Sequence, residues 1–169
     1  MNRLCLIVLI AAFTSGSSGA VIAGQAKPAP TYETAIANSW KSVHNKILAM
    51  AKDPAFPDDK LAWKPHPDVR SVLEEFRHVT IGLEMTAAMA RGEKFDFDAR
   101  EKADASKPKT RASMLAEMEA AIAASFPLVE SKPMPQLVGW LEHQGEHYGK
   151  LVTAYRANRI VPPVSRPKS

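Results

Sequence analysis

The segment from Trp140 to Arg156 places two histidines, His143 and His147, four residues apart in a helical pattern. Side chains at this spacing project from one face of an α-helix, so both imidazoles could bind a single metal ion. The rest of that face is mostly apolar, and a second stripe beside it holds Leu141, Gly145, Tyr148, Val152 and Tyr155. A helix with two apolar faces is buried on two sides. The segment therefore predicts a helix inside a bundle.

Hydrophobic periodicity extends this prediction to the rest of the chain. Apolar residues recur at helical spacing, which predicts helices over residues 32–52, 71–91, 110–125 and 136–158. Residues 53–67 contain four prolines and are predicted to form a long loop, because proline cannot continue a helix. A chain of 169 residues can form one domain with a substantial core. We expect an all-α four-helix bundle over residues 27–169.

The second predicted helix carries clear end signals and a third histidine. Ser71-Val-Leu-Glu74 has the form of a capping box, and Gly92 is a typical helix stop. His78 lies within this helix, on a face that is otherwise apolar. Gly82, one turn from His78, would let a neighbouring helix or a ligand approach closely.

The connection between the second and third predicted helices is long and polar. Residues 92–109 alternate aromatic and charged residues around Phe95 and Phe97. A short strand is one interpretation, but we expect an irregular crossover anchored by the two aromatic rings. Phe126-Pro127 is expected to end the third helix.

The N-terminus has the pattern of a secretory signal peptide. Arg3 precedes an apolar run from Leu4 to Phe13, and small residues follow up to Ala26, where we expect cleavage, with Ala20 as the alternative site. The run is too short to span a bilayer, so no membrane span is expected after cleavage. Cys5 is the only cysteine, so the mature protein would contain no thiol. These features predict a periplasmic or secreted protein, and an uncleaved anchor is the alternative.

The net charge gives little indication of a charged partner. The formal charge is +4, but acidic residues are interleaved with the basic ones along the chain. Nucleic-acid binding generally requires basic residues clustered on one surface. We therefore expect no nucleic-acid partner.

Metal binding is the chemistry that the histidines favour. Without a cysteine in the mature protein, imidazoles are the main candidate ligands for a divalent transition metal, with carboxylates as possible supplements. We select His78, His143 and His147, although a single helix-borne histidine is more often a buried core residue. His44 is a candidate fourth ligand or proton carrier, but an interface role is favoured, and His66 is expected to be exposed.

Glu146 raises a separate hypothesis. His143-Gln-Gly-Glu-His147 matches the inverted zincin protease motif, in which the glutamate is a general base. Those proteases take a further ligand from far downstream on a larger chain, and little sequence follows His147. Glu146 also points about 100° away from His147 around a helix. We therefore interpret it as a solvated residue or an accessory partner of the metal ligands.

The order of these motifs resembles the DinB-like superfamily. The resemblance covers about Tyr32 to Pro163 and rests on Leu61-Ala-Trp63-Lys-Pro65, Ser71 to His78, His143-x-x-x-His147-Tyr-Gly149, Tyr155-Arg156 and Val161-Pro-Pro163. It implies a four-helix bundle with a long crossover between its second and third helices. It also implies a metal site near one end of the bundle with ligands His78, His143 and His147, open coordination positions, and a homodimer.

The resemblance leaves the activity undetermined. Characterised relatives include S-transferases and isomerases that use low-molecular-weight thiols, and many members have no known activity. The signal peptide is a departure, because the thiol-dependent relatives are cytosolic. We expect a divalent metal, zinc or nickel, and either a metal-dependent hydrolase or thiol transferase acting on a small molecule, or a non-catalytic metal-binding or stress-related protein. An open, partly polar pocket would favour the enzyme, whereas a site sealed by Met85, Met89 and Trp140 would favour the non-catalytic role.

Overall fold

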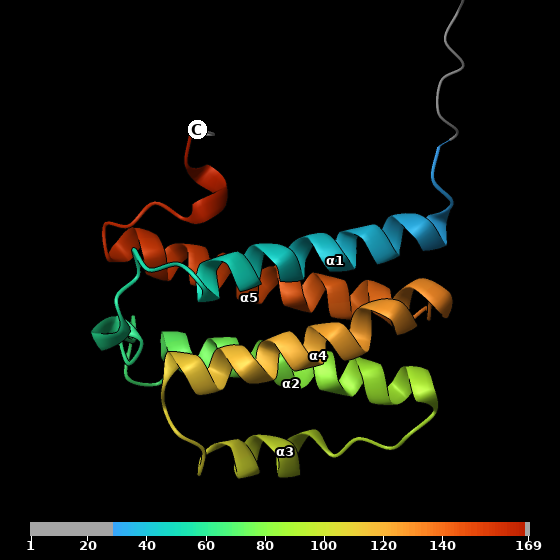
Figure 1. Ribbon diagram of the computed structural model, residues 1–169, viewed down its shortest axis with the longest axis horizontal. Helices are drawn as coiled ribbons and strands as arrows, with labels where there is room; N and C mark the ends of the chain where they lie inside the picture. The colour runs from blue at the N-terminus through green and yellow to red at the C-terminus, as the bar shows by residue number, and fades with distance from the viewer. Residues whose placement is uncertain (1–28, 168–169) are drawn as a thin grey trace, which may run out of the picture.

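The computed structural model describes residues 29–167, which form a helical bundle without a strand (Figure 1). This part of the chain contains five α-helices and two short 3-10 helices. The α-helices are α1 (Tyr32–Ala51), α2 (Val72–Arg91), α3 (Phe97–Asp104), α4 (Arg111–Ser131) and α5 (Leu137–Ala157), and the 3-10 helices are η1 (Asp58–Lys60) and η2 (Pro163–Ser165). The prediction of an all-α bundle is therefore confirmed.

The four long helices pack as two layers, with α1 beside α5 and α2 beside α4 (Figure 1). In Figure 1, α2 and α4 run in the same direction, opposite to α1 and α5. Two parallel helices that follow each other in the chain need a connection that returns along their length. This explains why the segment between α2 and α4 is long, and α3 lies within it, along the outside of the bundle.

The ends of α2 agree with the sequence signals. The Ser71 side chain accepts a hydrogen bond from the backbone N–H of Glu74, and the Glu74 carboxylate accepts one from the N–H of Ser71. Gly92 ends the helix with a φ of 80°, a left-handed conformation that glycine adopts without strain. These contacts fix where α2 starts and therefore where His78 stands.

The crossover differs from the sequence prediction, because it contains the helix α3 rather than irregular chain. Asp96 caps this helix by accepting a hydrogen bond from the N–H of Ala99 at 2.9 Å. The charged residues that follow have few apolar neighbours, so hydrophobic periodicity did not reveal the helix. One of the two expected aromatic anchors, Phe97, does contact the bundle, with its ring edge against His78.

The prediction that α4 ends at Phe126-Pro127 was also wrong, because the helix continues to Ser131 with Pro127 inside it. Proline removes one backbone hydrogen bond and usually disrupts a helix interior. Here Val129, in the turn after the proline, is fully buried against the core. The packing of this last turn against the core therefore outweighs the helix-breaking tendency of Pro127.

Two apolar clusters form the core, and Ile122 and Leu141 pack against both of them. One cluster joins α1, α2, α4 and α5 to the proline-rich loop through residues such as Met50, Phe56 and Tyr155. The other lies around Trp40, Leu83 and Leu137. The two clusters meet part-way along α1, α2 and α5, and His44, His78, Gly82, Gln144 and His147 lie at or next to this junction. The predicted ligands thus lie part-way along α2 and α5, rather than near one end of the bundle as the resemblance implies.

The predicted signal peptide, residues 1–26, lies outside the residues that the structure describes. Within residues 29–167, α4 is the one helix that is long and apolar enough to cross a membrane, judged by length and composition alone. Core helices of soluble proteins pass the same test, and Met114, Met118 and Val129 of α4 are buried in this bundle.

Candidate metal centre

Three imidazoles from two helices converge between α2 and α5. His143 and His147 project from the same face of α5, and His78 faces them from α2. One nitrogen of each ring lies within 4.8 Å of the corresponding nitrogens of the other two. The structure therefore brings together the three histidines that the sequence selected, although they lie far apart in the chain.

His147 is held by a buried glutamate. Its Nδ1 lies 2.6 Å from Oε1 of Glu75, and both side chains are almost completely inaccessible to solvent. A carboxylate can only accept this hydrogen bond, so Nδ1 carries the proton and Nε2 carries a lone pair in the neutral ring. Glu75 thus directs Nε2 of His147 toward the other two histidines, as carboxylates do for metal-bound histidines.

His78 has a similar partner, but that partner comes from the crossover. Its Nδ1 lies 3.0 Å from Oε1 of Glu101 on α3, and the same oxygen accepts a hydrogen bond from Arg70 at 2.9 Å. The Phe97 ring, also on α3, contacts the His78 ring edge-on, with 5.2 Å between centroids. The short helix therefore fixes both the tautomer and the orientation of His78.

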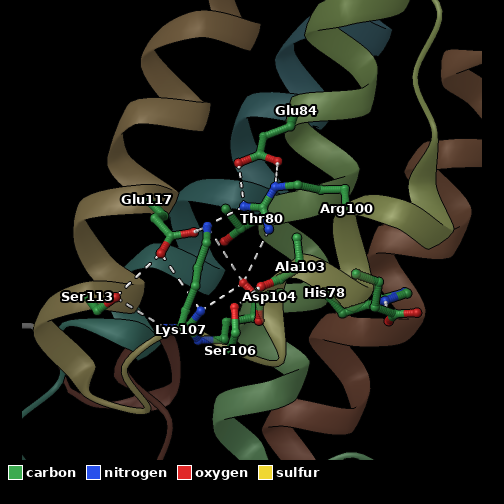
Figure 2. A network of polar contacts seen from close by, with 12 residues as sticks. His78, Thr80, Glu84, Arg100, Ala103, Asp104, Ser106, Lys107, Ser113 and Glu117 are labelled. Atoms are coloured by element: carbon green, nitrogen blue, oxygen red, sulfur yellow. Dashed lines mark hydrogen bonds and ion pairs between the residues drawn. The ribbon is translucent and has the colours of Figure 1, made fainter.

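Ion pairs fasten α3 to the bundle (Figure 2). Arg100 of α3 contacts Glu84 of α2 at 2.7 Å and Glu117 of α4 at 3.1 Å. In return, Asp104 of α3 accepts a hydrogen bond at 2.8 Å from Arg77, a buried residue of α2. Because these charges are only partly exposed, solvent and salt screen them less than a surface pair. The network holds Glu101 in position beside His78.

The spacing of the nitrogen atoms suits a bound cation. Nε2 of His143 and Nε2 of His147 are 2.9 Å apart. Two nitrogens bound to one ion at about 2.0–2.1 Å are separated by about 2.9 Å at a right angle and about 3.4 Å in a tetrahedron. Since Nε2 of His147 carries a lone pair, either a proton on His143 or a metal ion must lie between the two atoms. The donor set, three imidazoles without a thiolate, fits a divalent transition metal.

The surroundings lower the pKa of two of the imidazoles and of both carboxylates. Burial lowers the pKa of His78, and the hydrogen bond with Glu101 opposes this shift. Burial also lowers the pKa of His143, and the neighbouring His147 adds to the effect. Burial alone would raise the pKa of Glu75, but the hydrogen bond from His147 and the nearby cationic Lys150 bring it below its usual value. Neutral imidazoles are the form that binds a metal.

The site is open on one side. The side chain of His143 is 52% exposed, whereas that of His147 is 1% exposed. His78 lines two cavities, a larger one of about 230 Å³ shared with Arg70 and Glu101, and a smaller one of about 60 Å³ shared with His143. Met85 and Trp140 line the smaller cavity. A molecule from solvent can therefore approach the triad from the side of His143.

The other candidate residues lie apart from this centre or at its edge. His44 is buried, donates from Nδ1 to the carbonyl oxygen of Trp40 at 2.8 Å, and packs against the Trp40 ring with the two ring planes tilted by 51°. This placement agrees with the favoured interface role, and His44 is not part of the histidine group. Glu146 is exposed, with its carboxylate 3.8 Å from Nδ1 of His143. His66 is exposed in the proline-rich loop.

Three residues at the centre, Glu75, Glu101 and Gln144, were not predicted from the sequence. Glu75 follows the capping-box residue Glu74, so the sequence indicated an ordinary acidic residue in the first turn of the helix. Glu101 lies in the crossover, whose helix was not predicted. Glu75 lies three residues before His78 on the same helix, and this spacing was the one available signal. No spacing rule connects Glu75 to its actual partner, His147.

A comparison of the sequence with protein families agrees with this geometry. A profile of the DinB superfamily matches residues 44–160, which is more than half of the chain. The chain belongs to the DinB superfamily. The matched range includes all three histidines and both carboxylate partners. No curated protein and no solved structure matches the chain significantly.

Proposed function

We propose that this member of the DinB superfamily is an exported, metal-dependent enzyme in which His78, His143 and His147 hold one divalent ion, zinc or nickel. The observation that carries the proposal is the asymmetry of the triad. Two histidines are fixed by carboxylates, whereas the third is half exposed. A closed structural site would need no exposed ligand, whereas a catalytic site keeps a position open for substrate.

The chemistry proposed is hydrolysis of a small molecule or transfer of a thiol to a small electrophile. A divalent ion held by three histidines lowers the pKa of a coordinated water or thiol toward neutrality. Glu75 and Glu101 keep the two inner imidazoles in the tautomer that can bind. Glu101 also lines the 230 Å³ cavity, and both of its hydrogen bonds use Oε1. Its Oε2 is therefore the oxygen proposed to accept a proton from a molecule in that cavity.

Export and assembly are further parts of the proposal. Arg3 and the apolar run Leu4 to Phe13 support a cleaved signal peptide and a periplasmic or secreted protein. N-terminal sequencing of the protein from the extracytoplasmic fraction tests this, and an intact Met1 would contradict it. The family resemblance supports a homodimer, which light scattering of the mature protein tests. The interleaved charges support the absence of a nucleic-acid partner.

A non-catalytic metal-binding role is the alternative, and it is favoured by Met85 and Trp140, which line the smaller cavity beside His78. A metal-dependent enzyme would turn over a substrate, whereas a non-catalytic metal-binding protein would not. The zinc-loaded and nickel-loaded proteins should be assayed for hydrolysis of activated esters and for addition of a small thiol to an electrophile. We expect turnover with at least one metal, and loss of turnover in His143→Ala. Rates equal to those of the metal-free protein in every assay would favour the non-catalytic role.

A further inference from the structure

A third cavity, larger than the two that His78 lines, lies between the proline-rich loop, the start of α2 and the second half of α5. Its volume is about 690 Å³. Sites for small molecules are typically clefts of about 300–1,000 Å³ with mostly apolar walls and a few polar groups. The apolar residues of this wall are Pro65, Pro67, Val69, Val72, Leu151 and Ala154. We call this space the loop cavity.

The loop cavity borders the metal centre at Glu75 and Arg70. Glu75 lines the cavity and also holds His147 through its Oε1. Arg70 lines both the loop cavity and the 230 Å³ cavity that contains His78, and Glu74 is shared in the same way. The two cavities are therefore neighbours, with Arg70 between them. A molecule in the loop cavity that binds Arg70 lies next to the space in front of His78.

Each of the two carboxylates that orient the triad also contacts a cation of the loop cavity. Oε1 of Glu101 accepts a hydrogen bond from Nη2 of Arg70 at 2.9 Å, and Oε1 of Glu75 lies 3.8 Å from Nζ of Lys150. Arginine has five N–H donors, and Glu101 is the single acceptor found for Arg70 among residues 29–167. Lys150 makes no hydrogen bond to these residues, and its side chain is 58% exposed. Both cations therefore keep donors that a ligand can use.

The other charges of the loop cavity are already matched or screened. Acidic and basic residues line the cavity in equal number, so their pairing decides which ligand charge is favoured. Glu74 accepts a hydrogen bond from the N–H of Ser71 at 2.7 Å and pairs with Lys64 at 3.4 Å. Glu75 is engaged in the buried hydrogen bond at the metal centre. The Asp68 side chain is 86% exposed, so water screens its charge. The groups left to meet a ligand are therefore cationic.

We propose that the substrate is a small carboxylate with an apolar body, that the body lies against the apolar wall of the loop cavity, and that Arg70 and Lys150 bind its carboxylate. This inference names the substrate class of the proposed function and rests on it for the metal-dependent step. A carboxylate suits the site because a guanidinium can donate to both of its oxygens side by side. Because Arg70 borders the cavity of His78, the part of the molecule next to the carboxylate faces the metal centre.

Isothermal titration calorimetry of the mature protein, with and without zinc, tests the inference with hexanoate as the probe. Hexanamide and hexylammonium have chains of the same length but carry no charge or a positive charge. We expect saturable binding of hexanoate in both forms, and at least about tenfold weaker binding of the other two, because the charged hydrogen bonds to Arg70 and Lys150 are lost. Acetate, which lacks the apolar body, should also bind at least about tenfold more weakly. Equal affinities for hexanoate and hexanamide would overturn the proposal.

Variants of the lining locate the binding. Lys150→Gln should weaken hexanoate binding about tenfold and should fold normally, since this side chain is more than half exposed. Arg70→Gln should have at least the same effect, and Lys150→Gln decides alone if Arg70→Gln does not fold. Val69→Asn should reduce the preference for hexanoate over acetate, because Val69 is an exposed part of the apolar wall. Lys102→Gln, exposed on α3 and outside the lining, is the control and should leave the affinity unchanged. Unchanged hexanoate affinity in Lys150→Gln would overturn the proposal.

Zinc titration of the same samples separates this inference from the proposed function. If hexanoate binds but zinc does not, the carboxylate site is supported and the metal-dependent function is wrong. If zinc binds but hexanoate does not, the metal centre is supported and the carboxylate site is wrong. Hexanoate binding that requires zinc and is the same in Lys150→Gln would mean direct binding to the metal, and it would also overturn the carboxylate site.

Discussion

His147 and His78 are each oriented by one glutamate, but the two pairs lie in different surroundings. The pair of His147 and Glu75 joins two core helices and is buried on both sides. The pair of His78 and Glu101 joins a core helix to the crossover helix α3, and the Glu101 side chain is 42% exposed. The same chemistry is thus built once into the core and once onto an attached element. The first pair should contribute to folding and metal binding together, and the second mainly to metal binding.

The largest effect is expected for Glu75→Ala. It leaves Nδ1 of His147 buried without an acceptor, which should lower the free energy of unfolding by about 1–3 kcal/mol. Loss of a carboxylate behind a metal-bound histidine should also weaken zinc binding by about 10–100-fold. Chemical denaturation and a competitive zinc titration measure the two effects. Glu74→Ala is the matched control, since it removes the helix cap and should leave zinc affinity unchanged.

A histidine that is buried without a carboxylate provides the next comparison. Burial lowers the pKa of His44 to about 4, while its contacts with the Trp40 carbonyl and Gln144 oppose the shift. Between pH 6.5 and 4 the unfolded chain therefore binds a proton that the folded chain excludes, so stability falls as the pH falls. The loss from this residue should be on the order of 3 kcal/mol.

Denaturation at several pH values tests this prediction in wild type and in His44→Leu. The variant should lose less stability than wild type between pH 6.5 and 4, and it should retain its zinc. An identical pH dependence would show that His44 is not buried as a neutral ring. Loss of zinc would make His44 part of the metal centre.

The sequence revealed the imidazoles of this centre but not the groups that orient them. The spacing of His143 and His147 follows from helical geometry, and the position of His78 on an apolar face indicated burial. Glu75 and Glu101 act across helix interfaces, and no local pattern states which helices face each other. Glu101 also depends on α3, whose polar sequence gave no hydrophobic period. The helix ends marked by Ser71 and Gly92 were predictable because local hydrogen bonds determine them.

A smaller effect is expected for Glu101→Ala. Zinc binding should weaken by up to about tenfold because His78 loses its orienting partner. The unfolding midpoint should change little, since this carboxylate is substantially exposed. Glu93→Ala, an exposed residue in the same crossover, serves as the control. A loss of stability as large as that of Glu75→Ala would remove the distinction between the two pairs.

The smallest effect is expected for Glu146→Gln. Its carboxylate is exposed and lies 3.8 Å from His143, a distance at which solvent weakens the interaction. Zinc affinity should therefore stay within about twofold of wild type. A tenfold loss would assign Glu146 an accessory role at the metal centre.

The zinc content of the purified mature protein tests the central claim most directly. After gel filtration in metal-free buffer, elemental analysis should find one zinc ion per chain in wild type and in His44→Leu. It should find none in the His143→Ala/His147→Ala variant, with the helical content preserved in circular dichroism. Equal zinc in wild type and in the double variant would contradict the account, because the converging imidazoles would then not be the site.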